Sequence, residues 1–397
     1  MRRIQIYLLS AVLALGLFGG CGKKEEGAPF IMPSAPSAAV AAVPDKFEAS
    51  FVAVGDNLIH DTVYKDAYNK GGGKYDFTYA YQNIKPYIQG HDIAFINQET
   101  LVSRVHGVAS YPCFNSPIEV AYADMDMGFN VIGHSNNHMF DKGEKGLADT
   151  IAFWKEQDVC LVGAHDSEED LHTVQYTENN NITVGWVGTT QWTNGLGLPK
   201  GSKLRYIHAD ERDLLAQKIA ETKAACDVVA VSVHWGSEGT HNLTSAQKSL
   251  AQWLCDQGVD IIVGGHSHTI QPITWLTGKN GQKTLCIYSM GNFISSQSSS
   301  YNMLAGMVEL KLEKDIKSGK VNIKDVYYDP IVTHYTSGMR NFTVYRLVDY
   351  TESLANSHGV RSYDSFSLSY LKETYKNVID REFYRDEVKT YLGGKLV

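Results

Sequence analysis

Short apolar runs alternate with amphipathic stretches along most of the chain. Bounded runs rich in Val and Ile predict buried strands, and apolar residues spaced three or four apart predict helices between them. The predicted strands are residues 49–54, 92–96, 131–133, 181–187, 227–233, 259–263 and 285–289. The predicted helices are residues 79–88, 118–127, 145–157, 209–225 and 245–257. Alternation of this kind is typical of an α/β fold.

Beyond residue 300 the pattern changes to an alternation of apolar and polar residues. It predicts antiparallel strands at residues 307–312, 321–328 and 342–347, followed by one helix at residues 367–391. There is no internal repeat and no stretch typical of a linker between two domains. We therefore expect one domain over residues 47–345 and a helical extension, residues 346–397, packed on it.

The first residues have the features of an export signal. Two arginines precede an apolar run from Ile6 to Phe18, which is too short for a confident membrane span. The small residue before Cys21 resembles the bacterial lipoprotein cleavage site, in which the cysteine becomes acylated, although Phe18 stands where an aliphatic residue is usual. We expect a signal peptide at residues 1–20 and lipidation at Cys21; the alternative is an ordinary signal peptide with Cys21 incidental.

Residues 21–46 are rich in Ala, Pro and Ser and lack a helical period, which predicts a flexible tether. Together with lipidation, the tether predicts a protein anchored to the cell membrane on its extracytoplasmic face.

The composition of the whole chain is that of a globular protein, with 43% hydrophobic and 20% charged residues. The formal net charge is −8 and no basic stripe is present, which argues against a nucleic-acid partner. Five cysteines follow Cys21 without a C-x-x-C motif, so the chain has neither a disulfide framework nor a zinc–thiolate motif.

Candidate chemistry gathers where predicted strands end. The apolar run at residues 259–263 breaks into two glycines and then His266 and His268. Two imidazoles one residue apart, on a loop just past a buried strand, suit a divalent metal because both rings can enter one crevice. Other strand ends supply a carboxylate, an amide or an imidazole: Asp56, Glu99, Asn137, His138 and His234. This mixed nitrogen and oxygen set suits Mn, Fe, Zn or Mg, and two metals that share a carboxylate can stabilise an in-line displacement.

Six motifs in order carry a family resemblance. They are G-D at 55–56, N-x-E at 97–99, N-N-H-x-x-D-x-G at 136–143, H-W-G-x-E at 234–238, G-H-x-H-x-x-Q-P at 265–272 and S-x-G-N-F at 289–293. The set resembles the CapA family of bacterial poly-γ-glutamate capsule synthesis proteins, whose fold is related to the calcineurin-like metallophosphatases. The resemblance covers about residues 48–300. It implies a two-sheet β-sandwich flanked by helices (α/β/β/α), with strands and a helix following at the C-terminus.

The resemblance also implies roles for the residues at the strand ends. Asp56 and His268 would bind one metal, Glu99 would bridge, and Asn137, His234 and His266 would bind a second. His138 would serve as general acid or transition-state donor. Residues near the predicted crevice that would contact substrate are Asn97, Trp235, Glu238 and Asn292.

Two positions depart from the metallophosphatase pattern. Leu58 stands where a D-x-H histidine belongs, and the bridging residue is Glu99 where Asp is usual. The first metal is therefore one ligand short, unless His60, Asn97 or water supplies it.

Several of these residues have a simpler structural interpretation. Asp56 could form only an Asx-turn, and Asn137 could cap the helix that follows. Asp141 fits a cap or a partner of a ligand better than a ligand itself. His234 and Trp235 alone could be core packing. Five histidines lack motif support and are assigned to surface or structure: His91, His106, His134, His165 and His241.

Two functions remain open at this stage. One is a metal-dependent hydrolase or transferase acting on phosphoester or γ-glutamyl amide bonds. The other is a non-catalytic, metal-containing subunit that holds an anionic polymer or organises a membrane synthase. Both place the protein in poly-γ-glutamate synthesis, export or anchoring, and both follow from the resemblance. The glycine-rich loop at residues 189–200 lies near the crevice, where substrate contact and a plain surface loop are equally compatible with its composition.

Overall fold

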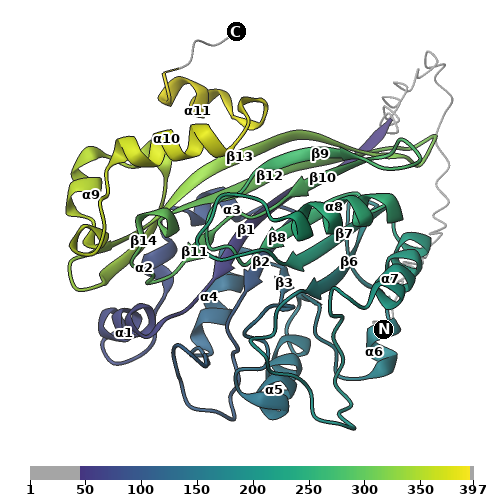
Figure 1. Ribbon diagram of the computed structural model, residues 1–397, viewed down its shortest axis with the longest axis horizontal. Coiled ribbons are helices and arrows are strands. Elements are labelled where there is room, and N and C mark those ends of the chain that lie inside the picture. The colour runs from purple at the N-terminus through teal and green to yellow at the C-terminus, as the bar shows by residue number, and fades with distance from the viewer. Residues whose placement is uncertain (1–44, 394–397) are drawn as a thin grey trace, which may run out of the picture. The chain divides into compact units, whose positions relative to one another are not determined.

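Two β-sheets form the centre of the computed structural model, which describes residues 45–393 (Figure 1). The first sheet has the order β14-β13-β12-β1-β2-β3-β4, and β11 also pairs with β1. Its strands are β1 (Lys46–Asn57), β2 (Ile93–Gln98), β3 (Val131–Gly133), β4 (Cys160–Val162), β11 (Asn292–Ile294), β12 (Leu304–Asp315), β13 (Val321–Thr336) and β14 (Arg340–Arg346). β1 to β4 are parallel, and β12 to β14 extend the sheet in antiparallel fashion from β1.

The second sheet has the order β5-β6-β7-β8-β10-β9. Its strands are β5 (Gln175–Asn179), β6 (Ile182–Thr190), β7 (Val228–His234), β8 (Ile261–Gly265), β9 (Ile273–Thr277) and β10 (Lys283–Ile287). The four central strands are parallel, and β5 and β9 close the two edges in antiparallel pairs. Parallel strands end at the same edge, so polar residues at those ends are brought together.

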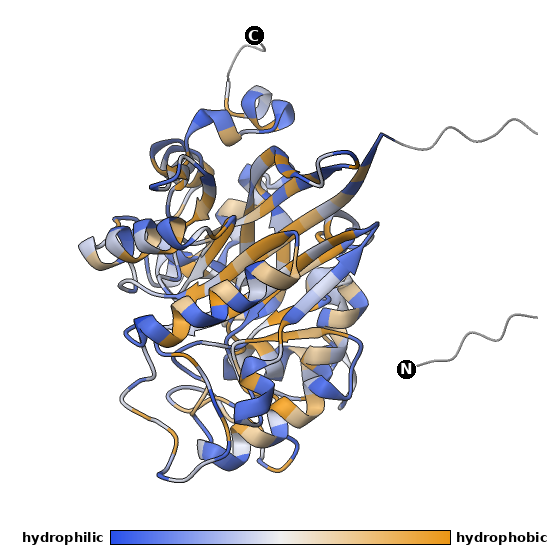
Figure 2. Cartoon of the chain, turned by 90° about the vertical axis from the view of Figure 1, so that its right-hand side faces the viewer, coloured by the Kyte–Doolittle hydropathy of each residue, from blue (hydrophilic) through white to orange (hydrophobic). Residues whose placement is uncertain are grey.

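The two sheets pack face to face through large apolar side chains. Phe51 of β1 and Phe95 of β2 both stack on Trp186 of β6, with ring centroids 6.0 and 5.4 Å apart. Side chains alternate across a strand, so the next residue, Val187, points to the opposite face and joins the core under the helices. Figure 2 shows the central strands mostly orange and the helices blue on part of their surface. Burial on both faces explains why these strands are continuous apolar runs.

Helices cover the outer faces and edges of the sandwich. The helices are α1 (Asp61–Lys70), α2 (Thr78–Tyr81), α3 (Lys85–Ile88), α4 (Glu119–Met127), α5 (Gly143–Lys155), α6 (Glu168–His172), α7 (Arg212–Ala225), α8 (Ser245–Gln257), α9 (Glu352–Ser357), α10 (Leu368–Val378) and α11 (Asp386–Tyr391). α7 packs against β6 and β7, and α8 against β9 and β10. The expected fold class, two sheets flanked by helices with further strands and helices at the C-terminus, is confirmed.

The prediction of one helix over residues 367–391 is wrong. α10 ends at Val378 and a 3-10 turn at residues 381–383 precedes α11. Phe383 is buried there, and Tyr384 packs against Tyr375 with ring centroids 4.7 Å apart. Arg385 then pairs with Asp329 of β13 at 2.9 Å. These tertiary contacts need a break in the chain direction that a continuous helix cannot provide.

Other sequence expectations concern regions at or beyond the limits of the described residues. The predicted signal peptide, the acylated Cys21 and nearly all of the predicted tether lie outside residues 45–393. Within residues 45–393, the helices are all too short or too polar to cross a membrane. The boundary at residue 345 between domain and extension stays a prediction.

Candidate metal centre

The close approach of the two sheets at their strand ends depends on glycine. Gly264 and Gly265 end β8, and a Cβ atom on Gly265 would lie 2.7 Å from Oδ1 of Asp56. A Cβ atom on Gly264 would lie 2.1 Å from the carbonyl oxygen of Tyr288. Both distances are shorter than real Cβ contacts. Gly264 therefore lets β8 pack closely on the end of β10 in its own sheet, and Gly265 lets the 266–268 loop approach Asp56 in β1 of the first sheet.

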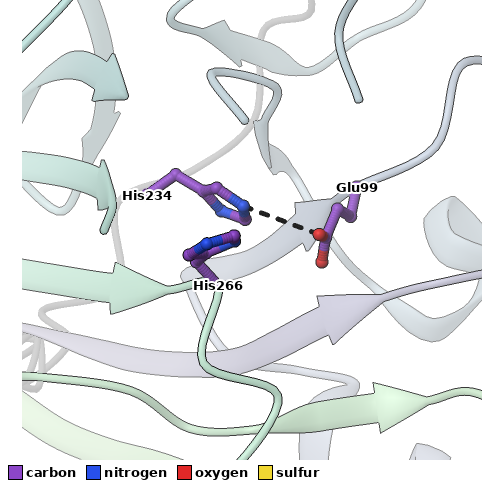
Figure 3. Close-up of side chains that lie close together, drawn as sticks. All are labelled: Glu99, His234 and His266. Atoms are coloured by element: carbon purple, nitrogen blue, oxygen red, sulfur yellow. Dashed lines mark ion pairs between the residues drawn. The ribbon is translucent and has the colours of Figure 1, made fainter. Parts of the chain in front are cut away.

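Two groups of buried side chains meet at this edge and share one carboxylate. Glu99, His234 and His266 form one triad, and Asp56, Glu99 and His268 form the other. Within each triad the candidate ligand atoms lie within 4.8 Å of one another. Figure 3 shows the rings of His234 and His266 on one side of the Glu99 carboxylate, with Nε2 of His234 3.5 Å from Oε1. The structure thus brings together five of the six residues predicted as metal ligands.

Asn137, the sixth predicted ligand, reaches the same place. Its Oδ1 lies 3.0 Å from Nε2 of His234. The side-chain oxygen therefore faces the first triad, as a ligand of the same cation would.

Asp56 organises the histidine loop. Its Oδ1 accepts a hydrogen bond from Nδ2 of Asn97 at 2.7 Å. Its Oδ2 lies 3.2 Å from the backbone N of His266 and 3.1 Å from Nδ1 of His268. These contacts hold both histidines at positive φ, +96° for His266 and +55° for His268, a region that side chains with a Cβ seldom adopt. Strained backbone of this kind persists where the surroundings fix it, and it is common at functional sites.

Glu99 is the best evidence that a cation belongs here. The carboxylate is fully buried, and neither of its oxygens has a hydrogen-bond partner within the described residues. Burial raises the pKa of Glu99 well above its usual value, and Asp56 raises it further, although His268 opposes the shift. The imidazoles of His234 and His268 lie 3.5 and 3.7 Å from Oε1 and form no hydrogen bond with it. A buried carboxylate with two unmet acceptors is costly, and a divalent cation would satisfy both oxygens.

The histidines are in states that fit this interpretation. Burial and the neighbouring imidazole of His268 lower the pKa of His266 to about 3, and burial followed by His266 lowers the pKa of His234. Both rings are therefore neutral at pH 7 and can offer a lone pair. Burial also acts to lower the pKa of His268, but Glu99 and Asp56 raise it to about 9. His268 therefore carries a positive charge between two carboxylates when no metal is bound.

His138 lies beside this centre and is held by a carboxylate. Its Nδ1 is 2.8 Å from Oδ2 of Asp141, and the same oxygen accepts the backbone N–H of Phe114 at 2.6 Å. The ring of Phe114 meets the His138 ring edge-on, with centroids 4.8 Å apart. Asp141 thus orients His138 through Nδ1 and leaves Nε2 for proton transfer.

The residues predicted to contact substrate lie in different environments. Trp235 is buried, stacks on Tyr288 and donates its indole N–H to the carbonyl of Tyr288 at 2.9 Å, so in this structure it packs the core behind the site. Asn292 is also buried and donates to Ser295 and Gln297. Asn97 is bound to Asp56, while Glu238 is exposed beside the centre.

Leu58 stands where related metal sites have a histidine, and His60 does not replace that histidine in this structure. His60 is buried, and its Nδ1 lies 3.0 Å from the carbonyl oxygen of Leu58 and 3.3 Å from the backbone N of Ser296. It is not part of either triad. The triad of Asp56 therefore has three candidate ligands, and Asn97 is the amide next to it.

Two residues near the centre carry no sequence motif. Asn194 contacts Asn137 and His138, and Trp192 lies against His266. The sequence features that point to this loop are its glycine-rich composition and the Asn-Gly pair at residues 194–195.

The fold and the site together define a class: an α/β sandwich protein with a buried histidine and carboxylate centre at the ends of its parallel strands. The model of the family described as bacterial capsule synthesis protein PGA_cap matches residues 50–297, more than half of the chain. The chain belongs to this family, which confirms the resemblance read from the motifs.

Individual relatives agree with the family. PGA biosynthesis protein CapA of Bacillus subtilis (strain 168) is 28% identical over 275 residues, which cover 68% of this chain and 69% of that protein. Capsule biosynthesis protein CapA of Bacillus anthracis is 30% identical over 234 residues, 56% of this chain and 55% of that protein. A phosphatase structure from Mycoplasma pneumoniae is similar at 16% identity and a TM-score of 0.42, over 72% of this chain and 94% of that one. A score of this size carries no functional conclusion.

Proposed function

We propose that this protein serves the synthesis, export or anchoring of poly-γ-glutamate at the bacterial cell surface, by hydrolysing γ-glutamyl amide or phosphoester bonds at a divalent metal centre. The family match and the relatives named for PGA and capsule biosynthesis support the cellular role. One observation carries the chemical part: two buried triads share Glu99, whose oxygens have no hydrogen-bond partner within residues 45–393.

The residues divide between two cation positions. Asp56, Glu99 and His268 would hold one cation, and Glu99, Asn137, His234 and His266 the other. The donor set of imidazole nitrogen with carboxylate and amide oxygen fits Mn, Fe, Zn or Mg better than a metal that prefers thiolates. When bound, such cations supply Lewis-acid charge at the reacting group.

The chain's own contribution to the reaction is proton transfer and charge control. His138, oriented by Asp141, would donate a proton to the leaving group or stabilise the charge that develops there. The surrounding burial excludes water from the triads, which strengthens the electrostatic interactions of the charged groups.

We also propose that the protein is anchored to the outer face of the cell membrane through acylated Cys21. The support is the sequence alone: a signal-like segment, a small residue before the cysteine and a Pro-, Ala- and Ser-rich stretch after it. Labelled fatty acid should enter the native protein and be absent from Cys21→Ser. Equal labelling of both would refute the anchor.

A second function keeps support from one specific observation. Leu58 occupies the position of a usual histidine ligand, and the Asp56 triad has three protein ligands. A centre that fills one position poorly would suit a scaffold that uses metal to hold an anionic polymer or to organise the subunits of a membrane synthase.

Metal content separates these possibilities first. Plasma mass spectrometry on the purified protein should find near-stoichiometric metal, lost in His266→Ala and His268→Ala and kept in the matched control His172→Ala, whose ring is exposed. Absence of metal after reconstitution with Mn or Zn would overturn the centre.

Activity on γ-glutamyl peptides and phosphoesters then tests catalysis. Hydrolysis that disappears in His138→Ala, with metal content unchanged, supports the enzyme. A metal-loaded protein that hydrolyses neither substrate class supports the scaffold.

A further inference from the structure

An exposed tryptophan stands at the metal centre. Trp192 is 49% exposed, whereas Trp154, Trp186 and Trp235 are buried. Its ring lies 6.2 Å from the ring of His266, tilted by 34°. A large aromatic side chain normally gains by burial, so one left half in water beside a candidate ligand offers its face to a binding partner.

The tryptophan is held rigidly in this position. Its indole N–H donates to the carbonyl of Gly236 at 2.9 Å, two residues after His234. The side chain of Gln191 accepts the backbone N–H of Gly236, and the backbone N–H of Gln191 donates to the carbonyl of His234. The base of the loop is therefore fixed to the strand end that carries a metal ligand.

Asn194 extends the same loop toward the centre. Asn194 and Gly195 both have positive φ, +52° and +72°, and the N–H of Leu196 donates to the carbonyl of Thr193 at 2.9 Å. This is the tight turn that an Asn-Gly pair favours. Asn194 lies only at the limit of hydrogen bonding with its neighbours, 3.4 Å from Nδ2 of Asn137 and 3.5 Å from Nδ1 of His138. Contacts this long leave most of its bonding capacity for a ligand.

Glu238 is the third residue near the centre, and it lies two residues after Gly236, which binds the indole of Trp192. It is exposed, and the next residue, Gly239, donates its N–H to the carbonyl of Ser267, between the two histidines of the loop. Its charge acts on both Glu99 and His268. Within residues 45–393 the carboxylate of Glu238 forms no ion pair with a lysine, arginine or histidine.

We propose that Trp192, Asn194 and Glu238 form a recognition rim that binds the ammonium-bearing end of a γ-glutamyl chain at the mouth of the metal centre. An aromatic face, a carboxylate and an amide oxygen are together the groups that bind an ammonium ion. The same carboxylate repels a phosphate or a side carboxylate. Only the amino end of a γ-linked polyglutamate carries positive charge, so the rim selects that end. The polymer identity rests on the proposed function; the preference for an ammonium group does not.

A pair of peptides tests the rim in the metal-loaded, full-length protein. Calorimetry would measure the affinity of a γ-glutamyl tripeptide with a free amino end and of its N-acetylated form. The free form should bind about tenfold more tightly, as expected for a partly desolvated ammonium over an aromatic ring with one carboxylate. Glu238→Gln and Trp192→Ala should each reduce this preference severalfold, whereas Glu178→Gln, an exposed glutamate on β5, should leave it unchanged.

The outcomes distinguish the rim from the proposed function. Equal affinity of the two peptides, or binding of neither at millimolar concentration, overturns the rim. Loss of metal from Glu238→Gln also overturns it, because Glu238 would then be the missing ligand of the Asp56 cation. If the native protein loads no metal but still prefers the free amino end, the rim stands and the metal-dependent function falls.

Discussion

Glu99 provides the sharpest test of the metal centre, because its replacement should act in opposite directions with and without metal. Glu99→Gln keeps the shape of the side chain and removes the charge. In the metal-free protein the native carboxylate is fully buried, and among residues 45–393 neither oxygen has a hydrogen-bond partner. Burial raises its pKa well above the usual value, so the folded state holds the proton more tightly than the unfolded chain does.

The sign follows from this difference in protonation. A carboxyl group with a raised folded pKa loses stability as the pH rises above its unfolded value near 4.5, and the loss is present at pH 7. Glutamine has no proton to release, so the metal-free variant should be more stable than the native protein. Glutamine still buries a polar amide, so the gain is limited to the difference between an ionisable and a neutral group, about 1–3 kcal/mol.

Bound metal should make the native protein more stable than the Glu99→Gln variant. A ligand that binds only the folded state stabilises it by about 2.7 kcal/mol at a free concentration of a hundred times its Kd. The native protein should gain this stabilisation, and the variant should gain much less because both triads lose their shared carboxylate.

Thermal unfolding in EDTA and in excess Mn or Zn measures both halves of this prediction. The matched control is Glu178→Gln, where the native carboxylate is exposed. The control should unfold with the native protein in both buffers. A Glu99→Gln protein that is less stable than the native one in EDTA, or that gains as much from metal, would refute the reasoning.

Three further predictions use other parts of the structure. Burial lowers the pKa of His334 to about 4, so stability should fall by roughly 3 kcal/mol between pH 7 and pH 4 from this group, and His334→Phe should flatten the pH profile of thermal unfolding. Gly265→Ala places a Cβ atom 2.7 Å from Oδ1 of Asp56 and should cost about 1–3 kcal/mol of stability and reduce metal content. The control is Gly107→Ala, whose Cβ meets open space, and equal metal content in the two variants would contradict the clash. Asp141→Asn should lower kcat on any hydrolysed substrate by at least tenfold with little change in KM, because it leaves His138 poorly oriented; an unchanged kcat would exclude that role.

The order of strands and helices was largely predictable from local pattern. Residues 245–257 carry helical spacing after a threonine with glutamine three residues on, and Ser245–Gln257 is the helix observed, with both hydrogen bonds of that capping box present. Local signals of this kind act within a few residues of the chain. The prediction of one continuous C-terminal helix was wrong because long-range contacts decide that region. The break at residues 379–384 is set by burial of Phe383 and by the ion pair of Arg385 with a distant strand.

The candidate site also has features that the sequence predicted and features that only the tertiary structure decided. The ligand-type residues were visible because each follows an apolar run that ends a strand. Their division into two triads was suggested only by the family resemblance. The sequence placed the loop at residues 189–200 near the crevice but did not single out Trp192 and Asn194. The pairing of β6 with β7 in the second sheet brings these two residues to the centre.

The sequence by itself therefore determined the α/β class, the positions of most elements and the chemical types available at the strand ends. These depend on short-range periodicity and on turn residues such as glycine and asparagine, whose preferences are local. The packing of one sheet on the other decided that Glu99 is shared, that Asp56 holds the histidine loop and that a tryptophan stands at the mouth. Those relations join residues far apart in sequence, and only burial of the apolar faces between the sheets brings them within bonding distance.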